Sequence, residues 1–138
     1  NTKSPQWRRW FGEAHRCVVP FDAFSEPYNA PGKPSEPVWF ALDETRPLAC
    51  FAGSWTRWTS VRKLKDGETT DNLFGFLTTD ANAVVAEVHP KAMPVVLTSM
   101  DEVETWLTAP VDEALALQRP LDDGGLPRLH RKNPELRF

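Results

Sequence analysis

The chain has 138 residues, which suits one domain with a buried core and no disulfide staples. Its hydrophobic fraction of 41% and charged fraction of 25% are ordinary for a soluble globular protein, and no apolar run approaches the length of a membrane span. Residues 1–65 carry ten Lys and Arg against six Asp and Glu, a net of +4, whereas residues 66–138 carry six against thirteen, a net of −7. The overall charge of −3 therefore does not exclude nucleic-acid binding by the first half.

The first half of the sequence predicts one short helix followed by a series of strands. Ser4 is a helix cap and Pro5 suits the first helical position, so a helix is expected to begin there. Apolar runs bounded by Gly, Pro, Asn and Asp predict the strands. Gly53, inside one run, indicates a bulge or a close approach of another backbone. The expected strands cover 16–20, with an irregular continuation to 26, then 38–42, 48–55 with an extension over 57–61, and 73–79.

The second half predicts short helices around one more strand. Asn82 is a cap-like residue that begins a short helix, and this helix is expected to end at His89 because a residue before proline avoids the helical region. Ser99 with Glu102 forms a capping box at the start of another helix. The remaining expected elements are a strand over 94–97, a helix over 112–117 and a polar tail from 118 that wraps the surface.

Many short strands with few helices indicate an α+β fold that is mainly β. We expect a curled antiparallel sheet, barrel-like, with a few short peripheral helices. The whole of 1–138 is interpreted as a single domain and as a monomer. Nothing in the sequence suggests secretion, so a cytoplasmic location is expected.

Two titratable residues stand at corners of the predicted fold. Glu26 follows the apolar run 18–24, and a carboxylate at the end of a buried segment is partly desolvated, which suits acid–base work. His89 stands at a helix-to-loop corner, and histidine exchanges protons near neutral pH. The alternatives are an ordinary turn-facing glutamate and a helix-terminal histidine that meets free carbonyl groups. Position alone leaves these alternatives open.

The sulfur and imidazole groups do not form a metal-binding pattern. Cys17 and Cys50 both lie in apolar strand-like runs, so we expect buried free thiols, with a disulfide as the alternative. The two cysteines and three histidines are scattered, without CxxC, HExxH or a helical i, i+4 pair. No metal and no other cofactor is therefore expected.

Cations stand close to aromatic residues in two stretches of the first half. Single-stranded nucleic acid needs positive charge for its phosphates and flat faces for its bases. The alternative is that the rings belong to the core and the charges are solvated. The basic residues are Lys3, Arg8, Arg9 and Arg16 among Trp7, Trp10 and Phe11, and Arg57, Arg62, Lys63 and Lys65 after Trp55 and Trp58.

Several ordered blocks of the sequence resemble the SRAP (SOS response-associated peptidase) family, whose members process abasic sites in single-stranded DNA. The resemblance covers about residues 1–110, and its strength lies in the order and spacing of the blocks. The blocks are Asn1-Thr2-Lys3-Ser4, Arg16-Cys17-Val18-Val19-Pro20 with Phe24-Ser25-Glu26, Ala52-Gly53-Ser54-Trp55, Phe76-Leu77-Thr78-Thr79-Asp80-Ala81-Asn82 with His89 and Met93-Pro94-Val95-Val96-Leu97, and Trp106-Leu107.

This resemblance implies an enzyme that uses a cysteine placed directly after the initiator Met. The α-amine and thiol of that cysteine condense with the ring-opened aldehyde of an abasic site and give a thiazolidine crosslink, and the enzyme also removes its own initiator Met. The segment with this cysteine would precede Asn1, so residues 1–138 are expected to lack the nucleophile and to be inactive alone. The resemblance further implies association with the bacterial nucleoid at damage sites.

The resemblance also assigns roles to residues of this chain. Glu26 would be the acid–base residue, His89 would protonate the opening sugar or stabilise a Schiff base, and Asn1 would orient the nucleophile and the DNA. Lys3 and Lys91 take the places of phosphate-binding arginines, and Thr78 adds a hydroxyl to the pocket wall. With the neighbouring cations, the expected DNA-binding residues are Lys3, Arg8, Arg9, Thr78 and Lys91. Between His89 and the Met-Pro pair, this sequence has one residue more than the common family pattern.

Two other classes of function remain open from the sequence. One is a non-catalytic module that binds single-stranded DNA. The other is a hydrolase in which Cys17 and His89 form a nucleophile and base, although a cysteine inside an apolar run does not readily give an accessible thiolate.

Overall fold

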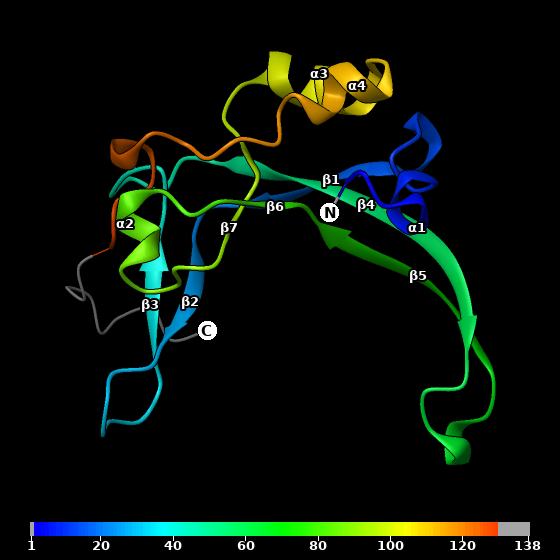
Figure 1. The fold of residues 1–138 in the computed structure, drawn as a ribbon, viewed down its shortest axis with the longest axis horizontal. Helices are drawn as coiled ribbons and strands as arrows, with labels where there is room; N and C mark the ends of the chain where they lie inside the picture. Colours follow the sequence, from blue (N-terminus) through cyan, green and yellow to red (C-terminus); the bar gives the residue numbers. More distant parts are fainter. Residues whose placement is uncertain (1, 130–138) are drawn as a thin grey trace.

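The computed structural model describes residues 2–129 and has an antiparallel sheet at its centre (Figure 1). Its central strand is β4 (Ala49–Ser60), whose first half pairs with β1 (Arg16–Phe21) and whose second half pairs with β5 (Thr69–Phe76). The short β8 (Val96–Leu97) also pairs with the start of β4. The predicted strands over 48–55 and 57–61 therefore form one continuous strand.

Two smaller antiparallel pairs complete the strands of the described residues. In one, β2 (Phe24–Tyr28) pairs with β3 (Glu36–Phe40), and in the other β6 (Thr78–Thr79) pairs with β7 (Met93–Pro94). Figure 1 shows the β2–β3 hairpin and the β4–β5 ribbon extending downward at opposite ends of the central sheet. The pairs form three separate sheets, so the fold has more strand than helix, but the barrel-like closure we expected is not confirmed.

Within residues 2–129, four short α-helices lie among the strands. Two of the three predicted caps make the expected bond: the Asn82 side chain accepts a hydrogen bond from Val85 N–H, and the Ser99 hydroxyl accepts one from Glu102 N–H. Ser4 precedes α1 as predicted, but its side chain makes no cap hydrogen bond. The helices are α1 (Pro5–Arg8), α2 (Ala83–Ala86), α3 (Met100–Thr108) and α4 (Val111–Leu115), with 3₁₀ turns at Glu13–His15, Leu64–Asp66 and Asp123–Gly125. Among residues 2–129, no helix is long and apolar enough to cross a membrane.

The core has two parts because successive residues of β4 point to opposite faces of the sheet. Phe51 belongs to a hairpin-side core, which the β2–β3 hairpin and α2 cover, and Ala52 belongs to a helix-side core, which α3 and α4 cover. Leu126 is fully buried in the hairpin-side core, and Leu121 packs against it. The expectation that the segment from 118 only wraps the surface was therefore wrong, since two leucines anchor it.

Gly53 marks a close approach of three strands and not a bulge. It pairs in continuous register with Cys17 on β1 and with Phe76 on β5. A Cβ atom at this position would lie 2.9 Å from the Cys17 sulfur and 3.1 Å from the carbonyl oxygen of Gly75. A side chain of any kind would therefore push neighbouring strands apart.

The substitution Gly53→Ala is expected to lower the free energy of unfolding by about 1–3 kcal/mol, because the new methyl overpacks the junction of β1, β4 and β5. Gly75→Ala is the matched control, since a Cβ there meets no atom within 4 Å. Its effect should stay within about 0.5 kcal/mol. Urea titrations followed by circular dichroism measure both changes, and equal values for the two variants would contradict the close approach.

Candidate functional site

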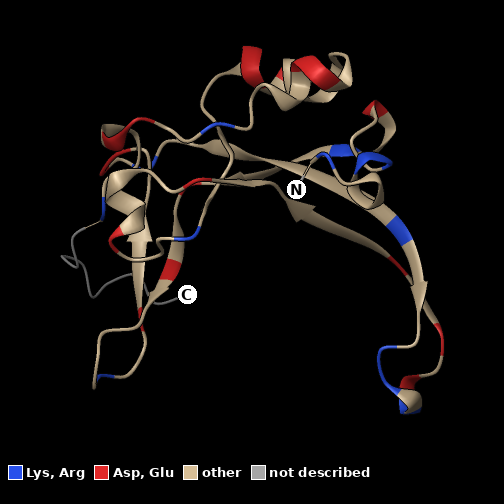
Figure 2. Cartoon of the chain, in the orientation of Figure 1, with Lys and Arg blue, Asp and Glu red and all other residues tan. Residues whose placement is uncertain are grey.

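Glu26 lies in the middle of β2, opposite Val38 of β3. It is partly buried, as its position after an apolar run predicted. Its neighbours Phe24 and Val38 pack against the hairpin-side core, and Figure 2 shows the acidic position on the β2 ribbon. Its carboxylate forms no hydrogen bond or ion pair with any side chain or backbone group of the described residues. The carboxylate is thus held on a strand without a polar partner among the described residues.

His89 directly follows the last turn of α2, where its backbone N–H donates to the carbonyl oxygen of Val85. Its ring Nδ1 lies 2.8 Å from the carbonyl oxygen of Ala92. A carbonyl oxygen can only accept, so Nδ1 carries a proton and Nε2 of the neutral ring presents a lone pair. The side chain is partly buried. The structure thus fixes both the orientation and the tautomer of this imidazole.

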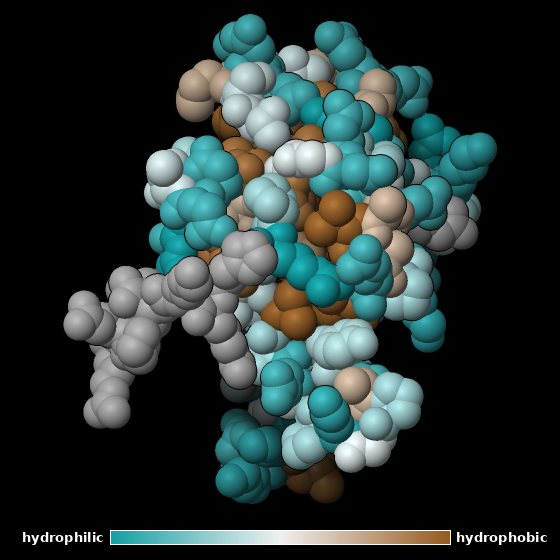
Figure 3. Space-filling view, turned by 90° about the vertical axis from the view of Figure 1, so that its left-hand side faces the viewer, coloured by the Kyte–Doolittle hydropathy of each residue, from teal (hydrophilic) through white to brown (hydrophobic). Residues whose placement is uncertain are grey.

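Glu26 and His89 lie at the border of one core. Val88 and Met93, on either side of the His89 loop, belong to the hairpin-side core, against which the β2–β3 neighbours of Glu26 also pack. The two side chains make no hydrogen bond with each other or with any other side chain of residues 2–129. On this side of the molecule, apolar residues show between hydrophilic ones (Figure 3).

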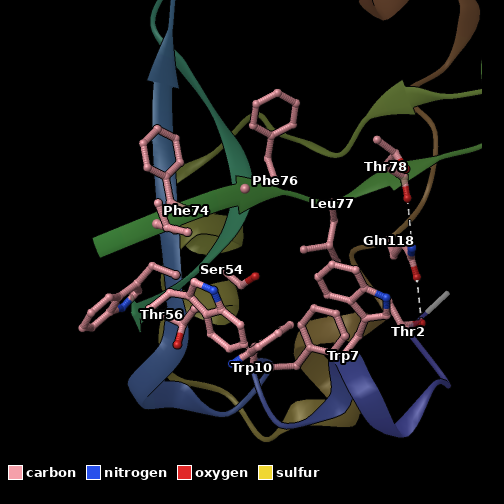
Figure 4. A pocket seen from close by; sticks show the side chains of 15 residues that line it. Thr2, Trp7, Trp10, Ser54, Thr56, Phe74, Phe76, Leu77, Thr78 and Gln118 are labelled. Atoms are coloured by element: carbon pink, nitrogen blue, oxygen red, sulfur yellow. Dashed lines mark hydrogen bonds between the residues drawn. The ribbon is translucent and has the colours of Figure 1, made fainter. Parts of the chain in front are cut away.

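Thr78 lies at a pocket of about 510 Å³ that is lined by residues of the α1 region, β4 and β5 (Figure 4). The Gln118 side chain joins two parts of its wall: Nε2 donates to the carbonyl oxygen of Thr78 at 2.9 Å, and Oε1 accepts from the Thr2 hydroxyl at 3.2 Å. The first described residue of the chain is thereby held beside β6. Asn1, which was expected to act next to Thr2, lies outside the described residues.

The expected DNA-binding cations are divided between two regions. Lys3, Arg8 and Arg9 lie exposed at and around α1, whereas Lys91 is exposed on the loop after His89. Figure 2 shows Lys and Arg gathered around α1 and the start of β1, with Asp and Glu on α3 and α4. The charge asymmetry of the sequence is therefore also a separation in space.

Arg16 does not belong to the exposed cations, although its sequence position suggested it. It is 5% exposed and donates to the carbonyl oxygen of Ala109 at 2.5 Å. Its guanidinium lies 5.8 Å from the ring centroid of Trp106, and burial lowers its pKa. Arg16 therefore fastens the end of α3 to β1 and is not available to phosphates.

Cys17 and Cys50 are free and partly buried, so the disulfide alternative does not apply. Burial raises the pKa of both thiols. A raised pKa leaves less thiolate at neutral pH, and the thiolate is the nucleophile. This weakens the hydrolase interpretation, in which Cys17 would attack a substrate. Among residues 2–129, no group of three or more His, Cys, Asp and Glu side chains could hold a metal ion.

Alkylation of Cys17 by iodoacetamide at neutral pH is expected to be at least about tenfold slower in the native protein than in urea. Mass spectrometry of the Cys17 peptide measures the rate, with Cys50 as an internal comparison. Burial raises the pKa of the Cys17 thiol in the folded protein above its value in the unfolded chain, which is about 8.5. Below that unfolded value the neutral thiol adds to the free energy of unfolding, and this contribution is lost as the pH rises through the folded-state pKa. Rapid native alkylation of Cys17 at neutral pH would revive the hydrolase interpretation.

Sequence reasoning missed Gln118 and the contact between Trp10 and β4. Gln118 was assigned to a surface tail, and a single glutamine carries no signal of its contacts. Trp10 contacts Trp58 edge-to-face, with ring centroids 6.3 Å apart, although 48 positions of the sequence separate them. The two aromatic and basic stretches were noticed separately, but only the structure shows that they meet.

Comparison with known families completes this picture. The family model for SOS response associated peptidase (SRAP) matches residues 1–128. The chain belongs to the SRAP family. A search of curated proteins gave no match. Membership of SRAP connects the chain with the response to DNA damage, and the match includes the segments that carry Glu26, Thr78 and His89.

Proposed function

We propose that this SRAP chain supplies the acid–base groups of a centre that processes abasic sites in single-stranded DNA. The nucleophile in this proposal is the α-amine and thiol of a cysteine directly after an initiator Met, and it lies outside residues 1–138. Glu26, His89 and Asn1 are the proposed catalytic residues, and Lys3, Arg8, Arg9, Thr78 and Lys91 are the proposed DNA contacts. The protein would act as a monomer, without a metal or other cofactor.

The observation that carries this proposal is the arrangement of His89. Its Nδ1–H is bonded to the Ala92 carbonyl, so Nε2 is the nitrogen left for a substrate. Once protonated, Nε2–H can donate to the ring oxygen of an abasic deoxyribose as the sugar opens to its aldehyde. An imidazole anchored by the backbone keeps this geometry whether or not the substrate is present.

Glu26 would exchange the protons of the condensation. The α-amine adds to the aldehyde carbon and loses one water, which gives a Schiff base. The thiol sulfur then adds to the same carbon while its proton passes to the nitrogen, which closes the thiazolidine ring. An unpaired carboxylate can take a proton from the attacking amine and return it to the departing water, so protons balance across the step. Removal of the initiator Met, which exposes the amine, would use the same carboxylate.

The proposed function can be tested by covalent adduct formation with the aldehyde of an abasic site. The natural full-length protein is incubated with a single-stranded oligonucleotide that holds one abasic site, and a denaturing gel is expected to show a covalent adduct. An oligonucleotide whose abasic site has been reduced to the alcohol is the control and should give none, because it has no aldehyde. Normal binding of the abasic oligonucleotide without any adduct would contradict the proposal.

The second candidate is a module that binds single-stranded DNA without chemistry. The exposed cations around α1 beside an aromatic pocket favour it, because they suffice for binding. The same experiment separates the two candidates, since binding without an adduct is the result that this second function predicts.

A further inference from the structure

The pocket beside α1 is built from aromatic rings that the fold does not bury. Trp7 and Trp10 of the α1 region meet edge-to-face with ring centroids 5.3 Å apart, and Trp10 meets Trp58 of β4 at 6.3 Å. Trp7 is 46% exposed and Trp58 45% exposed. Figure 4 shows Trp7 and Trp10 on one wall of the pocket, with Phe76, Leu77 and Thr78 above them on the segment that leads from β5 into β6. Large aromatic surfaces left open in a hollow indicate a binding site.

The lining of this tryptophan pocket carries no charged side chain. Its polar members are four hydroxyl residues and Gln118, whose amide keeps one N–H and one lone pair after its bonds to Thr78 and Thr2. Its volume of about 510 Å³ lies within the range of small-molecule sites, about 300–1,000 Å³. The interior therefore suits a flat, uncharged group with a few hydrogen-bonding edges.

Basic residues stand next to several pocket-lining residues in the sequence. Lys3 comes next to Thr2, Arg8 next to Trp7, and the Arg9 guanidinium lies 4.4 Å from the ring centroid of Trp10. Lys3 and Arg8 are exposed and form no ion pair within residues 2–129. On the paired strands that line the pocket, Asp71 of β5 lies opposite Trp58 of β4. A neutral aromatic interior with a cationic margin complements a flat group attached to an anionic chain.

We propose that the tryptophan pocket holds an unpaired base of single-stranded DNA while Lys3, Arg8 and Arg9 contact the adjoining phosphates. The base would stack on the exposed rings of Trp7 and Trp58, and Gln118 would bond to its edge. The identity of the strand as DNA rests on the proposed function, but the pocket itself requires no abasic site. It would hold an intact base next to the lesion.

The first test uses undamaged single-stranded oligonucleotides and paired tryptophan variants. Trp7→Leu and Trp58→Leu are each expected to weaken binding about tenfold, because each removes one stacking surface. Trp39→Leu is the matched control, since Trp39 is also 46% exposed but lies on β3 outside the pocket, and its binding should be unchanged. Fluorescence anisotropy measures the affinities, and thermal unfolding checks each fold. Equal affinities for all three variants would overturn the proposal.

The second test needs no substitution. An oligonucleotide with 5-iodouracil is irradiated in complex with the full protein, and mass spectrometry locates the crosslinked residue. Crosslinks at Trp7, Trp10 or Trp58 are expected, and crosslinks only at residues outside the pocket would overturn the proposal. A duplex of the same sequence should not crosslink there, because its bases are paired. Strong crosslinking from the duplex would likewise contradict an unpaired base.

These tests are independent of the abasic chemistry. An adduct that forms normally in Trp7→Leu and Trp58→Leu proteins, with unchanged oligonucleotide affinity, would refute the base pocket and leave the proposed function intact. Pocket-dependent binding without an adduct would refute the proposed function and leave the base pocket intact.

The substitution Arg8→Glu should also weaken oligonucleotide binding and reduce its salt dependence. Lys33→Glu is the charge-reversal control, because Lys33 is exposed in the β2–β3 turn.

Discussion

Replacing Trp106 with alanine is expected to lower the free energy of unfolding by about 4 kcal/mol. The side chain is fully buried in the helix-side core. Its indole N–H donates to the carbonyl oxygens of Cys17 at 2.8 Å and Gly53 at 3.1 Å, which are register partners on β1 and β4. Alanine would leave a cavity and remove the donor from both carbonyls. Because a domain has about 5–15 kcal/mol in total, urea titration should show a large fall in the midpoint.

Two further variants separate the contributions of Trp106. Trp106→Phe keeps much of the apolar volume but has no donor, so a loss of about 1–3 kcal/mol is expected. Trp39→Ala removes an indole that is 46% exposed, and its cost should stay below about 1 kcal/mol. If Trp106→Ala and Trp39→Ala had equal stabilities, the indole would not be the fastening point between α3 and the sheet.

The largest effect on activity is expected for Glu26→Gln in the full-length protein. The amide has nearly the shape of the carboxylate but cannot exchange a proton, so the rate of adduct formation should fall by about 100-fold or more. Removal of the initiator Met should slow as well. Quenched time courses on denaturing gels measure the adduct, and intact mass measures the Met. Asp22→Asn is the matched control, because it neutralises an exposed carboxylate just before β2.

His89→Ala should behave differently, because its proposed role is in opening the sugar and reversing the crosslink. Adduct formation should remain largely intact, whereas reversal or strand cleavage should be impaired. His15→Ala is a close control, since the His15 Nδ1 also lies at 3.0 Å from a backbone carbonyl, that of Trp55. Equal loss of every activity in the Glu26 and His89 variants would contradict separate roles and indicate a folding defect.

Elements whose signals are local were predicted well from the sequence. The caps at Asn82 and Ser99 begin α2 and α3, because the hydrogen bonds that define a cap lie within a few residues. Strand β1 and the long β4 follow continuous apolar runs. The proline after His89 predicted the end of α2 to within a few residues, because the effect of a proline on the preceding backbone is also local.

Elements whose positions depend on a partner strand were predicted less well. The loop after β4 was expected to continue to Asn72, but β5 begins at Thr69 because it continues the ladder with β4. The strand expected over 38–42 starts earlier, at Glu36, since β2 supplies partners back to Tyr28. The run 94–97 divides into β7 and β8, which pair with different strands. Pairing of this kind cannot be read from one segment alone.

The candidate site shows the same division. Position after an apolar run predicted the partial burial of Glu26, and the proline after His89 predicted its helix-to-loop corner. The connection from Gln118 to Thr78 spans 40 positions and arises from tertiary packing, whereas the bond from His89 to Ala92 spans three positions and depends on the conformation of the loop between them. Their residues belong to no local motif, so no pattern in the sequence could indicate them.

The hydrogen bond from His89 to Ala92 has a consequence for the evolution of this loop. The ring closes the loop on its own backbone, directly before Met93 pairs with Thr79. The extra residue between His89 and the Met-Pro pair lies in this closed loop, so a change of loop length during evolution would alter the segment that orients the imidazole.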